Sequence, residues 1–202
     1  MNRDERRTFL LSPASTMGRR AQYLFAPRSD FEVARQVRSP EGEAIGTVFA
    51  FLSGLYFRGK LTYARAFARP GSFIRIITPN RGLVSPDLRV TLRDLRAMSR
   101  GSIDLEHAPY RRSMTRAALA LAAELGDADV VLLGSIASDK YSRILLQVFG
   151  ERLLFPESFI GRGDMSRGGL LLRAVDENRE LDYIPLAGAI RHGKRPPRLA
   201  PR

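Results

Sequence analysis

The chain has 202 residues, of which 44% are hydrophobic, so it is long enough to bury the core of a single domain. Lysine and arginine number 33 against 21 aspartates and glutamates, a formal net charge of +12, which favours a polyanionic partner over a basic surface that binds nothing. The absence of cysteine excludes disulfides and thiol chemistry, two histidines give no case for a metal site, and no apolar run reaches the about 20 residues that span a bilayer.

The first expected strand, residues 8–11, follows a charged leader and ends at a small polar turn, residues 12–16. Gly18 then opens a helix, so the turn lies at a helix N-terminus, where backbone N–H groups can hold a phosphate or a base edge. A well-capped turn that binds no ligand is the alternative. We take Ser12 and Ser15 as candidate substrate-binding residues.

Residues 47–71 interleave aromatic and basic side chains, the combination that stacking on bases and pairing with phosphates requires. Helical spacing indicates, however, that most of these aromatic residues belong to the core. Only the segment 53–60 is expected to be an exposed turn. Its two cations, Arg58 and Lys60, are candidate phosphate contacts.

A second strand, residues 73–78, also ends in a polar segment. Asn80 lies in this segment and is a candidate substrate-binding residue, because its amide can pair with either a carbonyl or an amino edge. The next residue, Arg81, is a candidate phosphate contact.

Two helices are expected before the next strand. Residues 91–94 have the form of a capping box with aspartate in the last place, which predicts a short helix that ends near Met98. Residues 113–125 are rich in alanine and end at Gly126, which predicts a longer helix.

The stretch from residue 129 to residue 173 organises the sequence. Its apolar run, residues 130–133, is broken by Gly134 and Ser135, as is typical of a strand buried on both faces of a parallel sheet. A helix and a short strand, residues 153–155, complete a βαβ crossover. An irregular loop rich in glycine and arginine is expected over residues 161–169, at the carboxyl end of a strand, where ligands of open α/β sheets bind. This stretch adds two candidate substrate-binding residues, Gly134 and Ser135, and three candidate phosphate contacts, Lys140, Arg162 and Arg167.

The sequence predicts an α/β fold, a three-layer sandwich around a central, mostly parallel sheet of four to five strands. Residues 181–184 alternate in polarity and are expected to form an edge strand. Residues 1–190 are expected to form a single domain. The basic tail, residues 191–202, with Arg198 and Arg202 among its cations, is either an extended phosphate-binding arm or a disordered end.

This order of elements resembles the uracil-DNA glycosylase superfamily over most of residues 8–173. Residues 130–140 are similar to that family's third strand with its Gly-Ser turn and following helix. Residues 155–158 (FPES) fall at its His-Pro-Ser segment, and Asn80 falls at the asparagine that reads the flipped base. Residues 10–14 and 81–87 also resemble bacterial relatives of this fold, including the peroxide-stress DNA-binding proteins.

Two departures from the family pattern alter the expected chemistry. The turn 12–16 has no counterpart of the family's water-activating acid, and Phe155 replaces its histidine. Base excision requires a flipped nucleotide and a carboxylate or polarised water beside an oxocarbenium-like sugar. Three acids expected near the carboxyl ends of strands are candidates for that catalytic role: Asp87, Asp139 and Asp164.

The resemblance and its departures lead to one leading hypothesis. It is a DNA glycosylase that excises a modified base from double- or single-stranded DNA and leaves an abasic site, with a hypermodified, for example glucosylated, cytosine of phage DNA as the first substrate to test and anti-phage defence as the role. A non-catalytic DNA-binding or damage-response protein, and an enzyme acting on a small molecule, are the alternatives. We expect a cytoplasmic monomer that uses no metal or cofactor and binds no membrane.

Overall fold

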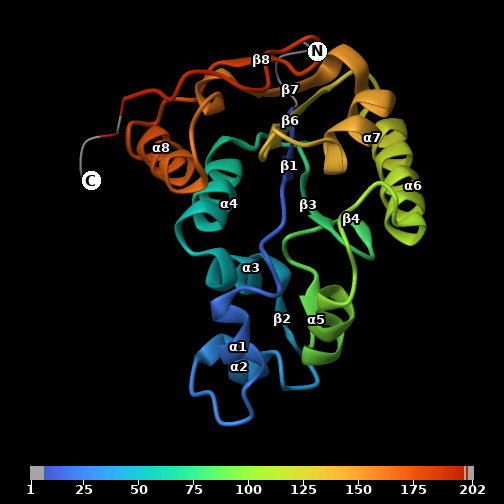
Figure 1. Ribbon diagram of the computed structural model, residues 1–202, viewed down its shortest axis with the longest axis vertical. Helices are drawn as coiled ribbons and strands as arrows, with labels where there is room; N and C mark the ends of the chain where they lie inside the picture. The colour runs from blue at the N-terminus through green and yellow to red at the C-terminus, as the bar shows by residue number, and fades with distance from the viewer. Residues whose placement is uncertain (1–6, 198, 200–202) are drawn as a thin grey trace.

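The structure, a computed structural model, describes residues 7–197 and residue 199. It is an α/β fold in which helices cover both faces of one mixed, six-stranded sheet (Figure 1). In spatial order the strands are β4 (Gly82–Val84), β3 (Ile74–Thr78), β1 (Arg7–Leu11), β6 (Asp129–Leu133), β7 (Leu153–Pro156) and β8 (Tyr183–Pro185).

The four inner strands are parallel, and the short strand at each edge is antiparallel to its neighbour. The mostly parallel sheet and the edge strand near residue 183 are therefore confirmed. The expected number of strands, four to five, is too low, because residues 82–84 turn back at Gly82 and pair with β3. A positive φ of 65° at Gly82 makes that reversal possible without a side-chain clash.

Alternating side chains of the inner strands feed two separate hydrophobic clusters, one on each face of the sheet. Phe9 and Leu11 of β1 pack with helices α3 (Ile45–Ser53), α4 (Leu55–Phe67) and α8 (Asp164–Asp176). Leu10, between them, packs with α6 (Ala108–Leu125) and α7 (Asp139–Phe149) on the other face. This three-layer arrangement is the expected one.

A smaller group of elements lies beyond the carboxyl end of β1 (Figure 1). It comprises α1 (Arg19–Phe25), α2 (Glu32–Gln36), α5 (Leu92–Ser99) and a two-stranded ribbon of β2 (Glu43–Ala44) and β5 (Arg89–Val90). The capping box that predicted α5 is present, since the Thr91 backbone N–H donates to the Asp94 carboxylate at 2.9 Å. Helix α6 starts earlier than expected, with Pro109 in its first turn.

The expected loop over residues 161–169 is wrong in its second half, because helix α8 begins at Asp164. Gly168 lies inside this helix, where α8 packs closely against α4. A Cβ atom at position 168 would lie 2.9 Å from the Leu55 carbonyl oxygen and 2.9 Å from Tyr56 Cα. The glycine therefore serves close helix packing rather than loop flexibility.

Two short 3₁₀ helices, η2 (Gly150–Arg152) and η3 (Glu157–Phe159), flank β7. After β8 the described part of the tail, up to residue 197, has no helix or strand. Arg191 forms an ion pair with Asp139, and the Arg162 guanidinium donates to the Pro197 carbonyl at 3.3 Å, so residues 191–197 lie against the body of the protein. Of the tail's cations, Arg198 and Arg202 lie outside the described residues. No helix within the described residues is long and apolar enough to cross a membrane.

Candidate functional site

The site is built where the inner strands β1 and β6 end side by side. Leu11 pairs with Leu133, and the Ser12 backbone N–H donates to the Leu133 carbonyl at 3.1 Å. After β1 the chain adds β3 and β4 on one side of it, and it then crosses to the other side to add β6 and β7. The strand order therefore reverses at the boundary between β1 and β6. Crevices at such a point bind ligands in open α/β sheets.

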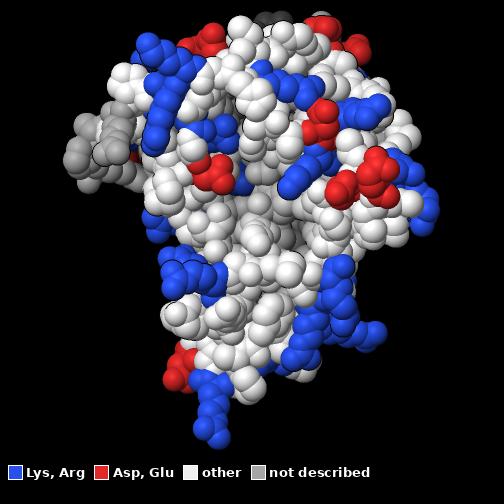
Figure 2. Space-filling view, in the orientation of Figure 1, with Lys and Arg blue, Asp and Glu red and all other residues white. Residues whose placement is uncertain are grey.

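A cleft of about 570 Å³, here called the central cleft, opens at this boundary. Its wall includes residues 12–17 after β1, Tyr56 of α4, Pro79 after β3, and Ser135, Lys140 and Tyr141 around the start of α7. Figure 2 shows a hollow near the middle of this face, over the end of β1, with basic side chains on several sides of it and a few acidic ones among them. Exposed Lys140 belongs to the wall itself.

A buried lysine lies behind the wall. Lys60 of α4 is 1% exposed, and its Nζ atom donates to the Ser12 carbonyl at 2.5 Å and to Ser12 Oγ at 2.8 Å. The same atom lies over the ring of Tyr56, 4.3 Å from its centroid. Burial lowers the pKa of Lys60 from 10.5 to about 7, although the Asp164 charge opposes this shift.

Polar groups continue from Lys60 along the strand ends. The Ser12 side chain lies beside the Tyr141 hydroxyl, which donates to the Ser135 carbonyl at 2.7 Å. Gly134 makes room for this arrangement, since a Cβ atom there would lie 2.9 Å from both Ser12 Cβ and the Tyr141 hydroxyl oxygen. Burial raises the pKa of Tyr141 to about 12, so its phenol stays protonated near neutral pH.

Two further polar groups complete the central cleft. The Tyr56 hydroxyl is buried and has no hydrogen-bond partner within the described residues, and burial raises the pKa of this phenol. Asp164, at the start of α8, lines the cleft and forms an ion pair with Arg167 at 3.5 Å. The cleft thus combines a carboxylate, an unpartnered phenol and small hydroxyl groups.

The structure brings together most of the expected substrate-binding residues. Ser12, Ser15 and Ser135 line the central cleft, and Gly134 lies directly beneath its wall. Asn80 is exposed and does not line the cleft, whereas its neighbour Pro79 does.

Only one of the three candidate acids lies at the central cleft. Asp164 belongs to its wall, whereas Asp87 forms an ion pair with Arg65 at 3.0 Å and Asp139 pairs with Arg191. Neither Asp87 nor Asp139 is part of the lining.

Some of the candidate phosphate contacts are exposed and others are buried. Arg58, Arg81 and Lys140 are exposed, although Arg81 is paired with Asp94. Arg162 is half-buried and donates to the Ser158 carbonyl at 3.0 Å. Two assignments are wrong: Lys60 and Arg167 are buried and hydrogen-bonded to Ser12 and to the Phe159 carbonyl, respectively, so they are not surface clamps.

The segment 53–60 is correspondingly not an exposed turn, because it is mostly the first turns of α4, with Tyr56 and Phe57 buried. Sequence reasoning missed the roles of Lys60, Tyr56 and Tyr141. A signal was present: Tyr56, Lys60 and Tyr63 recur at helical spacing, which places the lysine on the buried stripe of α4.

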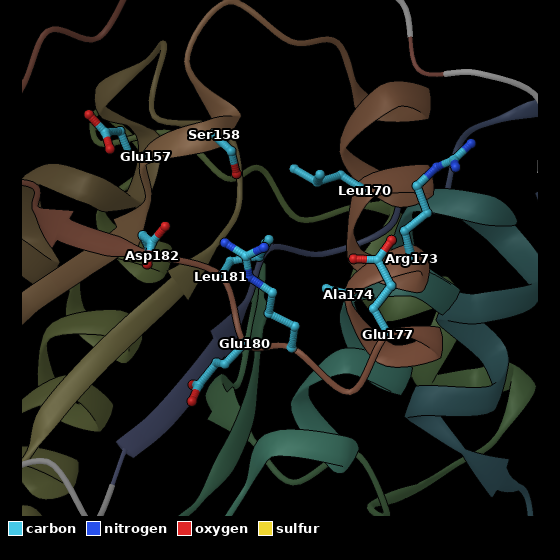
Figure 3. A pocket seen from close by; sticks show the side chains of 10 residues that line it. Glu157, Ser158, Leu170, Arg173, Ala174, Glu177, Glu180, Leu181 and Asp182 are labelled. Atoms are coloured by element: carbon cyan, nitrogen blue, oxygen red, sulfur yellow. The ribbon is translucent and has the colours of Figure 1, made fainter.

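A second cavity of about 430 Å³ lies between α8 and the segment that leads into β8 (Figure 3). Its labelled side chains mix both signs of charge, with Arg173 near Glu177 and with Glu180 and Asp182 on the facing segment (Figure 3). None of its lining residues is shared with the central cleft.

Within the described residues no group of three or more histidine, aspartate or glutamate side chains is arranged to hold a metal ion. The chain matches no protein-family model, and neither curated proteins nor solved structures give a significant match.

Proposed function

We propose that the protein is a DNA glycosylase that flips out and excises a modified base, leaving an abasic site. The observation that carries this proposal is the Asp164 carboxylate on the wall of a cleft at the β1/β6 boundary, together with the Tyr56 phenol and Ser12. The cleft volume of about 570 Å³ lies within the range of pockets that enclose small ligands. The net charge of +12 and the basic side chains around the hollow in Figure 2 suit a DNA strand.

In this proposal the flipped nucleotide enters the central cleft with its sugar towards Asp164. The carboxylate orients a water molecule and stabilises the positive charge that develops on the sugar as the N-glycosidic bond breaks. The leaving base gains negative charge at the same time. The protonated Tyr56 hydroxyl, which is buried at the cleft wall and has no hydrogen-bond partner within the described residues, can donate a hydrogen bond to that charge.

The wall residues also bear on which base fits. Ser12, Ala14 and Ser15 are small, and they line the cleft at the end of β1. Small side chains leave room for a substituent on the base, which favours a bulky modified cytosine of phage DNA over plain uracil. Anti-phage defence is the role that such a substrate implies.

A base-release assay tests the proposal. Purified protein is incubated with plain DNA and with genomic DNA from phages that carry modified cytosines, abasic sites are cleaved with alkali, and the freed base is identified by mass spectrometry. Release of a modified base that the Asp164→Asn variant no longer releases is the expected result. DNA that stays intact in every sample would reject the proposal.

Some observations favour a second candidate, a DNA-binding protein without catalysis. Phe155, which falls at the family's histidine, is fully buried in β7, and Asp87 and Asp139 are held in ion pairs. This candidate predicts binding that weakens steeply with salt and no base release from any DNA. The same assay, read alongside a binding titration, separates the two.

A further inference from the structure

Two aromatic rings stand half exposed on the small group of elements beyond β1. Tyr23 of α1 is 51% exposed and Phe31, just before α2, is 49% exposed. Their ring centroids are 5.4 Å apart, with an angle of 57° between the planes. Most of the protein's other described aromatic side chains are buried, and an exposed aromatic pair often marks a binding surface.

Contacts with α3 and with the α1–α2 connection hold the two rings in place. Phe31 packs against Phe51 of α3 with 5.2 Å between the ring centroids, and the Arg20 guanidinium donates to the Phe51 carbonyl at 3.0 Å. Arg38 donates to the carbonyls of Pro27 and Ser29 at 2.8 and 2.9 Å and so braces the connection between α1 and α2. The rings are held in place on one side while they remain open on the other.

The charge around the rings is mainly positive. Residues 17–39 contain five arginines and two acids, and one of these acids, Glu32, is paired with Arg35 at 2.6 Å. Arg28 lines the same shallow hollow of about 600 Å³ as Tyr23 and Phe31, together with the second acid, Asp30. An aromatic surface beside guanidinium groups suits a ligand that carries both flat rings and phosphates.

The rings are also connected to the central cleft. Met17 lines that cleft and is 79% exposed, and the next residue, Gly18, is the N-cap of α1. Tyr23 lies four residues beyond Arg19 in this helix, about 6 Å along its axis at the rise of 1.5 Å per residue. A strand leaving the cleft past Met17 would therefore run onto α1, the helix that carries Tyr23.

We propose that Tyr23 and Phe31 form a stacking platform for unpaired bases of the DNA strand whose flipped nucleotide occupies the central cleft. This proposal rests on the proposed function for the identity of the strand. Base pairs in a duplex already stack on their neighbours, so the platform takes bases of single-stranded DNA or of a locally opened duplex. Every base has a flat face, so the platform binds without a sequence preference.

The test is a binding titration of the whole protein with a dye-labelled oligothymidylate at several salt concentrations. Tyr23→Leu and Phe31→Leu keep an apolar side chain but remove the ring, and each is expected to weaken binding by about tenfold. Tyr23→Trp keeps a ring and is expected to bind as the wild type does. Leu119→Ala is the matched control, because Leu119 is 56% exposed among arginines of α6 but is not aromatic.

Each outcome decides the matter. Leucine variants that bind as tightly as the wild type, or a wild type that does not bind the oligonucleotide, would overturn the platform. A wild-type dimer in sedimentation that the leucine variants dissociate would show instead that a second copy of the chain covers the rings. Base release is measured with the same proteins on phage DNA that carries modified cytosines: its absence, with ring-dependent binding of the oligothymidylate intact, would reject the glycosylase and retain the platform.

Discussion

Lys60 Nζ lies 2.8 Å from Ser12 Oγ and 2.5 Å from the Ser12 carbonyl oxygen, which ties a buried amine of α4 to the end of β1. The contact joins the helix layer to the strand end that forms the wall of the central cleft. It also places a titrating group in the core, where its protonation is linked to folding.

Stability should therefore depend on pH through Lys60. Its pKa is about 7 in the folded protein and 10.5 as the ordinary value, so between these limits the unfolded chain binds more protons than the folded one. The free energy of unfolding of the wild type, relative to the Lys60→Met variant, should rise with pH across this window, by up to about 1.4 kcal/mol per pH unit. Below pH 7 both states are protonated and the difference should be flat.

Urea unfolding of both proteins from pH 6 upwards measures this slope. Taking the difference between wild type and variant removes the contribution of the other titrating groups. Lys140→Met is the control. Lys140 is exposed, so the difference in free energy of unfolding between the wild type and this variant should not change with pH. A wild-type curve parallel to that of Lys60→Met would contradict the assignment.

Asp164→Asn should lower the rate of base release by at least about 100-fold, because the amide can neither take up a proton nor stabilise a cationic sugar by its charge. The measurement is single-turnover release on the substrate identified by mass spectrometry. Asp87→Asn is the matched control, since Asp87 is an exposed acid paired with Arg65 outside the cleft and should leave the rate unchanged. Equal losses in the two variants would refute the role of Asp164.

Adjacent glycines of α8 should respond to alanine with opposite signs. Gly168→Ala places a methyl group 2.9 Å from backbone atoms of α4 and should destabilise the fold by about 1–3 kcal/mol. Gly169→Ala meets nothing closer than 3.5 Å and should stabilise α8 by up to about 1 kcal/mol through helix propensity. Thermal or urea unfolding reports both, and a stabilising Gly168→Ala would show that the two helices are further apart than described.

Lys140→Ala should weaken DNA binding similarly for every sequence and reduce the slope of log K against log salt concentration by about 1, because one phosphate contact is lost. Arg116→Ala on α6, exposed but outside the central cleft, is the control. Titrations at several salt concentrations measure both slopes. An unchanged slope in Lys140→Ala would place the DNA elsewhere on the surface.

The sheet was predictable because its strands carry a signal in the sequence itself. The apolar run 130–133 has side chains suited to both faces, and it is buried on both in β6. The turn 12–16 and Ser135 were predictable for the same reason, since polar residues directly after buried strands must lie at the sheet edge where the cleft forms.

The contacts between α4 and α8 were not predictable in this way. Gly168 belongs to a segment rich in glycine and arginine, which is typical of a loop. Only its packing on Tyr56 explains a glycine within a helix. For Lys60 the sequence predicts a surface cation, because lysine is almost never fully buried. Its burial depends on Ser12, 48 residues away in the sequence, supplying two oxygens to the ammonium group.

The hydrogen bonds at Lys60 and at Ser135 each have a fixed direction while Lys60 is protonated. An ammonium group can only donate and a backbone carbonyl can only accept, so the Ser12 hydroxyl accepts from Lys60 and the Tyr141 hydroxyl donates to Ser135. Once Lys60 loses a proton, near its pKa of about 7, its amine can also accept a hydrogen bond, and the Ser12 proton can turn toward it. The donors and acceptors that this wall offers a ligand therefore change with pH.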